Sequence, residues 1–238
     1  MAVPTLVLWD IDHTLIETRG VGGELYRAAF EETAGRTMEH KAEVTGKTEP
    51  AILTETLKLH GLEPSNDYQA KYAEALARQY DQRADELRRR GRALPGASEA
   101  LAALAEQAGV IQTVLTGNLR AVAVTKLRVF GLDGFIDIEV GAYGDDEEDR
   151  PKLVAVAQQR AGAKYGADFG RDNTVILGDS PSDVETGLKG GAQVIGVASG
   201  KSTTEELRKA GAGTVLFDLR NPDSFRAALS SFVATSIG

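Results

Sequence analysis

The sequence predicts an α/β protein, a doubly wound parallel sheet core with an inserted α-helical cap domain, and three observations lead to this prediction. Beyond residue 95, short runs of branched apolar residues alternate with segments of helical periodicity. This alternation is typical of a parallel sheet with helices on both faces. A similar apolar run, Leu6 to Trp9, lies near the start of the chain. Between them, residues 17–93 show helical spacing without a convincing strand, which indicates a helical insertion.

The length of 238 residues suits one domain that carries an insert. We expect residues 1–16 and 94–238 to form the core and residues 17–93 to form the cap. Pro95-Gly96 is a strong turn signal at the point where the chain would return to the core.

The periodicity predicts each element in turn. In the cap, we expect helices over residues 22–34, 50–60 and 67–90, and the first two end at Gly35 and Gly61. In the core, the predicted helices cover 98–107, 120–130, 152–165, 181–189, 204–210 and 222–233, and the predicted strands after the first cover 110–115, 135–140, 174–177, 193–197 and 214–217.

Composition limits the classes of function. Lys and Arg number 27 against 35 for Asp and Glu, a net charge of -8 that argues against a general nucleic-acid binder. A local basic pocket could still bind a small anion. The sequence has no cysteine, which excludes disulfides and thiolate chemistry. Neither a basic, apolar leader nor a bilayer-length apolar stretch is present, so we expect a soluble cytoplasmic protein that does not bind membranes.

Two carboxylates, Asp10 and Asp12, follow the first strand directly. In an open parallel sheet, ligands bind at the carboxyl ends of the strands. Close carboxylates repel each other, and a cation or a charged substrate between them would explain the pairing. The alternative is that both side chains only solvate the end of the strand.

A hydroxyl and a flexible turn end the next core strand, in Thr116-Gly117-Asn118. The hydroxyl of Thr116 and the free backbone amides of Gly117 and Asn118 would suit a phosphate at the amino terminus of a helix. The same tripeptide is also an ordinary turn and helix cap.

A second pair of carboxylates, Asp179 and Asp183, follows the strand that ends near Leu177. Pro181 favours the start of a helix there, which places Asp183 in its first turn. These two residues could simply cap that helix and complement its dipole. Four carboxylates at two strand ends, however, favour a Mg²⁺ site, because Mg²⁺ prefers carboxylate oxygens supplemented by water and substrate oxygens.

Basic side chains could contribute to binding an anionic substrate. Arg150 and Lys152 flank Pro151 at the start of a predicted helix, although each alone is typical of a surface cation. On a cap loop, Gly46-Lys47-Thr48 resembles the end of a P-loop, but Lys41 stands where that pattern needs glycine.

Taken together, these residues resemble the haloacid dehalogenase superfamily, in its phosphatase branch with a helical cap after the first strand, similar to phosphoglycolate phosphatase. The segment from Asp10 to Leu15 resembles the DxDxT signature, with His13 where glycine is common. Thr116 resembles the second motif, and the segment from Gly178 to Asp183 the acidic fourth. For the basic third motif Arg150 is the favoured match, because it directly precedes a proline. Lys152 and Lys126 remain alternatives.

The resemblance implies a Rossmann-like core and a role for each matched residue. Asp10 would attack a phosphoryl group and form an aspartyl-phosphate, and Asp12 would act as general acid and then general base. Thr116 and Arg150 would hold the phosphoryl oxygens. Asp10, the backbone carbonyl of Asp12, and Asp179 would hold Mg²⁺, with Asp183 supporting them.

The resemblance also implies a reaction. An acid at Asp12 favours hydrolysis of phosphate esters over dehalogenation, since a halide leaves without a proton. The expected partner is a small phosphorylated metabolite, and the protein is expected to be a monomer or homodimer. The cap would close over the site and select the substrate, with Lys47 as a candidate contact. A sugar phosphomutase and a non-catalytic phosphate-binding or regulatory module are the alternatives.

Overall fold

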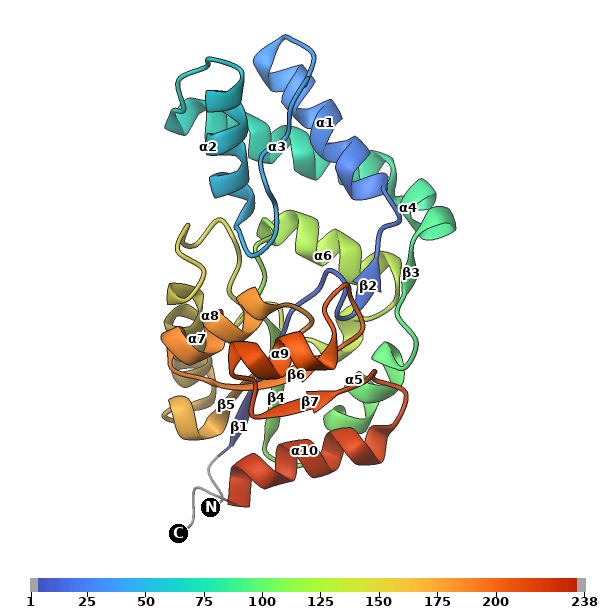
Figure 1. Cartoon of the computed structure of the whole chain (residues 1–238), viewed down its shortest axis with the longest axis vertical. Coiled ribbons are helices and arrows are strands. Elements are labelled where there is room, and N and C mark those ends of the chain that lie inside the picture. The colour runs from blue at the N-terminus through green and yellow to red at the C-terminus, as the bar shows by residue number, and fades with distance from the viewer. Residues whose placement is uncertain (1–3, 235–238) are drawn as a thin grey trace.

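The computed structural model describes residues 4–234. A helical part lies above a sheet with helices packed against it (Figure 1). The sheet has five parallel strands in the order β4-β1-β5-β6-β7, which confirms the predicted α/β class. The strands are β1 (Thr5–Trp9), β4 (Val110–Val114), β5 (Thr174–Gly178), β6 (Gln193–Val197) and β7 (Thr214–Leu216).

The first strand is buried on both faces, as the run of apolar residues predicts. Val7 and Trp9 pack on one side with α5 (Ala97–Ala105) and α10 (Pro222–Ala234), whereas Leu6 and Leu8 pack on the other side with α7 (Lys152–Tyr165). The reason is that successive side chains of a strand alternate between its faces. Within the described chain, no helix is both long and apolar enough to cross a membrane. The core helices are α5 (Ala97–Ala105), α6 (Arg120–Val129), α7 (Lys152–Tyr165), α8 (Pro181–Gly190), α9 (Thr204–Ala210) and α10 (Pro222–Ala234), with short 3₁₀ turns at η1 (Asp133–Phe135) and η2 (Arg171–Asn173).

The inserted region forms a helical cap with its own hydrophobic core. That core also includes Leu119, Val122 and Val129, from α6 and the residue before it, so α6 packs against the cap as well as the sheet. Two short strands, β2 (Ile16–Glu17) and β3 (Arg92–Ala93), pair antiparallel near the ends of the predicted cap. The exact boundaries of the cap stay a prediction. The cap helices are α1 (Val21–Ala34), α2 (Glu49–Leu59), α3 (Asn66–Gln82) and α4 (Ala84–Arg90).

The predicted helix over residues 67–90 is in fact two helices, α3 and α4, separated at Arg83. The backbone of Arg83 has φ -106° and ψ 21°, outside the helical range. Its guanidinium binds Glu86 at 2.6 Å and Glu24 of α1 at 2.8 Å. Tyr80 before the break and Leu87 after it are both buried in the cap core, so the apolar spacing continues through Arg83 and does not reveal the break.

The predicted strand over residues 135–140 is wrong, although the segment runs beside β4. The backbone amide of Asp137 donates to Gln112 at 2.9 Å, and a single bridge joins Leu115 to Ala142. Between these points the chain turns, because the carboxylate of Asp137 accepts the amide of Glu139 at 3.1 Å. A side chain that bonds to its own backbone in this way competes with strand pairing.

Candidate active site

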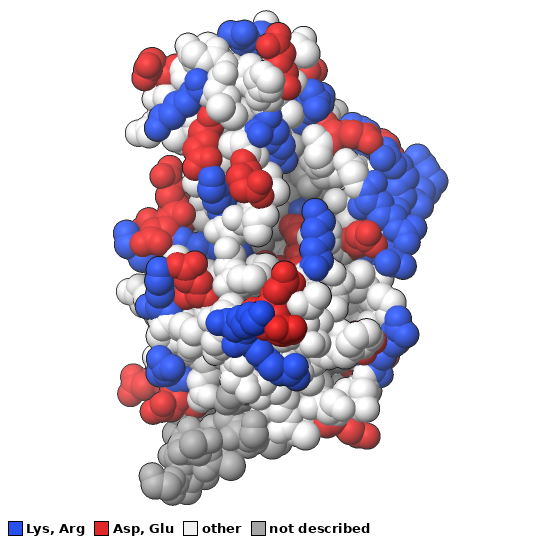
Figure 2. Space-filling model, in the orientation of Figure 1, with Lys and Arg blue, Asp and Glu red and all other residues white. Residues whose placement is uncertain are grey.

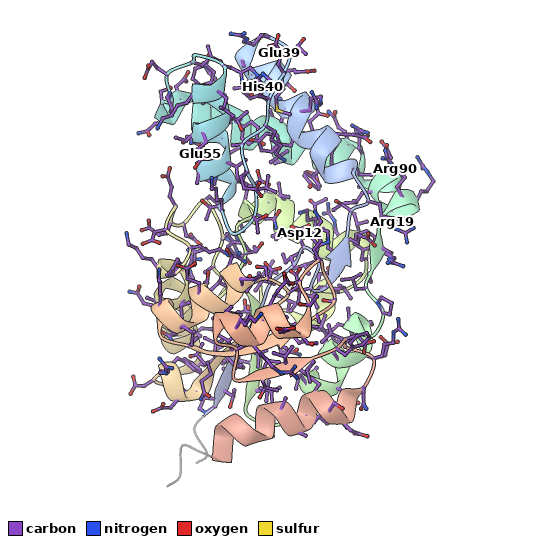
Figure 3. All side chains as sticks on the ribbon, in the orientation of Figure 1. Asp12, Arg19, Glu39, His40, Glu55 and Arg90 are labelled. Carbon is purple, nitrogen blue, oxygen red and sulfur yellow. The ribbon has the colours of Figure 1, made fainter. Side chains whose placement is uncertain are left out.

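The strand order brings the predicted motifs to one edge of the sheet. β1 lies between β4 and β5, so the residues that follow these three strands meet at their carboxyl ends. Asp10, Thr116 and Asp179 occupy these positions. Asp12 lies between the cap helices and the sheet (Figure 3).

Three of the four predicted metal ligands form a buried cluster. One carboxylate oxygen from each of Asp10, Asp179 and Asp183 lies within 4.8 Å of the others. Burial and the neighbouring charge of Asp183 raise the pKa of Asp10 well above its ordinary value. The same two causes raise the pKa of Asp179 to about 7. The hydroxyl of Thr14 lies between them, 3.2 Å from Asp10 and 3.4 Å from Asp179.

This donor set fits Mg²⁺, because hard carboxylate oxygens are its preferred protein ligands and a cation would relieve the mutual repulsion that raises these pKa values. The Asp12 side chain is not part of the cluster. Only its backbone carbonyl, the atom that the family resemblance implies, remains as the candidate ligand from that residue.

Arg150 is buried beside the acidic cluster. Its Nη2 donates to Asp10 at 2.9 Å and to Asp183 at 2.6 Å. The other oxygen of Asp183 accepts the amide and hydroxyl of Ser180 at 2.9 and 2.7 Å, in the capping box of α8. With both oxygens occupied by protein groups, Asp183 suits a supporting role. The Nε of Arg150 is buried without a partner among the described residues, and this leaves a donor for an anion.

Asp12 lies in the opposite electrostatic environment. The Nζ of Lys126 contacts its two carboxylate oxygens at 2.8 and 2.7 Å, and the side-chain amide of Asn118 donates to one of them at 2.7 Å. Burial raises the pKa of Asp12, but the Lys126 ammonium and these hydrogen bonds outweigh that effect, so the pKa is lowered. Burial alone would lower the pKa of Lys126, yet the charge of Asp12 raises it.

Thr116 is oriented by Asn118. The Thr116 hydroxyl oxygen accepts the backbone amide of Asn118 at 3.2 Å and its side-chain amide at 2.7 Å. A hydroxyl has two acceptor sites and one donor, and no described residue accepts the hydrogen of Thr116, which is therefore available to an incoming oxygen. The Asn118 side chain thus binds Asp12 and Thr116 together, an arrangement that the tripeptide does not reveal.

A cavity of about 370 Å³ lies between the cap and the core and contains these groups. The molecular surface is hollowed between its upper and lower parts (Figure 2). The core side of the cavity is lined by residues that include Asp10, Asp12, Thr116, Gly117, Asn118, Lys126, Arg150, Asp179 and Asp183. The cap side is lined by residues that include Tyr26, Lys41, Lys47, Glu49 and Tyr80.

Two predicted basic contacts differ in where they lie. Lys47 lines the cavity, but its Nζ also pairs with Glu55 at 2.5 Å. Lys152 does not line the cavity; its side chain is 62% exposed, and its Nζ lies 3.7 Å from Glu147 and 3.8 Å from Asp149. Arg150 lies in the turn before α7, whose N-cap is Pro151, whereas Lys152 is the first residue of the helix, so the two side chains leave the backbone in different directions. The fold therefore brings Arg150 to the site and leaves Lys152 outside it.

Sequence reasoning misses several cap residues of the cavity. Tyr26 and Tyr80 occupy apolar positions of their helices, and helical spacing cannot separate a packing side chain from a cavity-lining one. Lys41 precedes α2 in an irregular segment, where its Nζ lies 3.8 Å from the centre of the Tyr26 ring. No local pattern marks such a residue in advance.

The structure thus combines a parallel sheet, an inserted helical cap and, at the strand ends, an acidic cluster beside a buried arginine. The model of the haloacid dehalogenase-like hydrolase family matches residues 7–187. The chain belongs to this family.

Solved structures with the same fold cover nearly the whole chain. A haloacid dehalogenase family hydrolase from Deinococcus radiodurans, with bound phosphate and sodium, is 23% identical with a TM-score of 0.58, over 98% of this chain and 97% of that one. A predicted phosphoglycolate phosphatase from Haemophilus somnus is 17% identical with a TM-score of 0.64, over 96% and 99%. A candidate β-phosphoglucomutase from Bacteroides vulgatus is 16% identical with a TM-score of 0.66, over 98% and 91%. No curated protein sequence matches the chain.

Proposed function

We propose that this protein is a Mg²⁺-dependent phosphatase that hydrolyses a small organic phosphate monoester through an aspartyl-phosphate on Asp10. The observation that carries this proposal is the contrast between Asp10 and Asp12. Asp10 belongs to the acidic cluster and accepts from Arg150, whereas Asp12 accepts from Lys126 and Asn118. Two carboxylates in such different surroundings suit two different roles in one reaction.

In the proposed site, Mg²⁺ is held by Asp10, Asp179 and the backbone carbonyl of Asp12, with Asp183 in support. When bound, it neutralises charge that develops on the phosphoryl oxygens. Arg150 orients Asp10 and Asp183 through one guanidinium nitrogen, and its unpartnered Nε supplies a donor for a phosphoryl oxygen. The free hydroxyl hydrogen of Thr116 supplies another.

The reaction then proceeds in two steps. A carboxylate oxygen of Asp10 attacks phosphorus, the bond to the leaving oxygen breaks, and Asp12, protonated in the fraction of the enzyme that reacts, gives that oxygen a proton. In the second step, Asp12 takes a proton from a water molecule that attacks the aspartyl-phosphate, so that Asp10 and inorganic phosphate are released. Each proton that Asp12 donates in the first step is recovered in the second.

The cavity of about 370 Å³ between the cap and the core favours a small phosphorylated metabolite as substrate. We further propose that the protein is cytoplasmic and acts as a monomer or homodimer. The Haemophilus somnus structure is named as a predicted phosphoglycolate phosphatase and the Deinococcus radiodurans structure holds phosphate, and both are consistent with phosphate ester chemistry here. The Bacteroides vulgatus structure, a candidate β-phosphoglucomutase, supports a second candidate function, a sugar phosphomutase. That reaction would return the phosphoryl group to a sugar hydroxyl instead of to water.

The test is phosphate release from a panel of phosphorylated metabolites and an aryl phosphate, with Mg²⁺ and with a chelator. We expect release that the chelator abolishes and that Mg²⁺ restores, and the panel then ranks substrates. Isomerisation of a sugar phosphate without net phosphate release would instead establish the phosphomutase. The absence of both reactions would contradict the proposal and favour a binding role.

A further inference from the structure

Lys126 is a buried cation that the proposed reaction leaves without a role. It lies on α6, its side chain is 4% exposed, and it forms an ion pair with Asp12. A charge buried to this extent is costly unless it is paired and hydrogen-bonded. The Lys126 ammonium satisfies both conditions, which indicates that its side chain is held in one defined position.

Three oxygen acceptors surround the Lys126 ammonium. They are Asp12 Oδ1 at 2.8 Å, Asp12 Oδ2 at 2.7 Å and Asn118 Oδ1 at 2.7 Å. These contacts hold the ammonium on Asp12 and Asn118, whereas the cation beside Asp10 is Arg150. Lys126 is therefore less suited than Arg150 to the phosphate-binding role for which it is an alternative.

The same contacts leave one oxygen of Asp12 partly free. Oδ2 accepts from both Lys126 and Asn118, whereas Oδ1 accepts only from Lys126 among the described residues. A carboxylate offers about four acceptor sites, two on each oxygen. The remaining site on Oδ1 is thus the position from which Asp12 can exchange a proton with a substrate.

The helix that carries Lys126 is fixed on both sides. Val122 and Val129 of α6 are part of the cap core, and Ala123 and Leu127 are part of the sheet core. Asn118 adds a link from Lys126 to Thr116, because its Oδ1 accepts from the ammonium while its Nδ2 donates to the hydroxyl. Asp12 is therefore held by a residue of a rigid helix, and Asn118 fixes its position relative to the Thr116 hydroxyl.

We propose that Lys126, together with Asn118, is a positioning residue that fixes the Asp12 carboxylate so that Oδ1 faces the leaving-group oxygen and later the attacking water. This inference rests on the proposed phosphatase function and deepens it. The two buried cations then have different roles: Arg150 binds the phosphoryl group and orients Asp10, whereas Lys126 orients Asp12, the general acid and base.

The test compares substrates that differ in their need for a proton. A nitrophenyl phosphate loses a stable anion without protonation, whereas an alkyl phosphate needs the proton from Asp12. We expect Lys126→Met to lower kcat/KM for the alkyl phosphate about a hundredfold or more, the scale of general acid catalysis, and for the nitrophenyl phosphate less than about tenfold. Because kcat/KM covers only the steps up to loss of the leaving group, hydrolysis of the shared aspartyl-phosphate does not enter. Lys209→Met, the same change at an exposed lysine 73% open to solvent, should leave both values unchanged.

A second comparison covers the case in which Lys126→Met alone does not fold, since it removes the charged partner of Asp12. The double variant Asp12→Asn with Lys126→Met removes both charges. Measured on nitrophenyl phosphate, it should match Asp12→Asn within about twofold, because no acid remains to be positioned.

An equal loss on both substrates, or a further loss from Lys126→Met in the Asp12→Asn background, would overturn the positioning role. In either case, release by the wild-type protein would leave the proposed phosphatase function standing. If the wild-type protein releases phosphate from neither substrate, the phosphatase function fails and the role of Lys126 fails with it.

Discussion

At the scale of single residues, the site depends on how Asp10 and Asp12 are separated. They are two positions apart in the chain, yet Asp10 meets Arg150 and two other carboxylates while Asp12 meets Lys126. The backbone between them leaves the strand, and His13 has a φ of 67° in the left-handed region. This conformation gives a physical reason why glycine is common at that position of the signature.

Replacing the proposed nucleophile gives the first prediction. Asp10→Asn should fold, because the amide has the same shape and removes one negative charge from a crowded cluster. Its rate of phosphate release should fall at least about a thousandfold, since a neutral amide does not form the covalent intermediate. Circular dichroism checks the fold and a phosphate assay checks the rate. Turnover at the wild-type rate would contradict the assignment of Asp10.

The second prediction concerns Lys47, which lines the cavity from the cap. Lys47→Ala should change the ranking of substrates by about tenfold, the scale of one charged contact, while the chemical step stays intact. The measurement is kcat/KM across the metabolite panel. Glu55→Ala is the matched control, because it releases Lys47 from its ion pair without removing it. An identical ranking in Lys47→Ala and the wild-type protein would show that Lys47 makes no substrate contact.

At the scale of elements, two loops decide how the cap meets the core. The loop before α2 lies against the loop that follows β4: the amide of Glu49 donates to the carbonyl of Gly117 at 2.7 Å. A Cβ atom at position 117 would collide with the carbonyl oxygen of Lys47. Glycine is therefore needed there for the close approach of the two loops, in addition to any role of its amide in binding phosphate.

Gly117→Ala gives the third prediction. Because backbone atoms cannot yield as a flexible side chain can, the cap loop should move away from the core and open the cavity to water. We expect a fall in kcat/KM of about tenfold to a hundredfold, the cost of a misplacement of about 1 Å, and faster proteolysis near residues 44–48. Gly131→Ala is the control, since a Cβ at that position meets no atom within 4 Å and only its φ of 69° is strained. Unchanged proteolysis and activity in Gly117→Ala would contradict this account of the loops.

Element boundaries also mark where local reasoning fails. The apolar spacing of α3 and α4 continues through the break at Arg83, which instead depends on ion pairs with α1 and α4. The segment 135–140 has alternating apolar residues but turns, because the Asp137 side chain bonds to the local backbone. In both places a contact outside the repeating pattern decides the conformation.

At the scale of the whole molecule, the acidic cluster links metal binding to stability. The pKa of Asp179 is raised from 3.8 to about 7, so without a cation the folded protein binds this proton more tightly than the unfolded chain does. The stabilisation from this group is complete below about pH 4 and is lost as the pH rises to about 7. Mg²⁺ replaces the proton and should therefore stabilise the protein most at high pH.

The fourth prediction follows from this linkage. The Mg²⁺ concentration is fixed at about a hundred times the Kd at pH 8. It should raise the free energy of unfolding by about 2.7 kcal/mol near pH 8. The same concentration should raise it by much less near pH 5, where protons compete for the carboxylates. Thermal unfolding with and without a chelator at both pH values measures the difference. Asp179→Asn should lose most of the effect. An equal shift at the two pH values would contradict a metal site built on these carboxylates.

The sequence by itself determined the α/β class, the helical insertion and the clustering of Asp10, Thr116 and Asp179, because these follow from local periodicity and from the rule that parallel strands present their ends at one edge. Only the tertiary structure decided which cations reach the site: Arg150 and Lys126 enter it, and Lys152 stays at the surface. The physical reason is that a cation becomes part of a buried site through partners more than a hundred positions away in the chain, and no local pattern records such pairings.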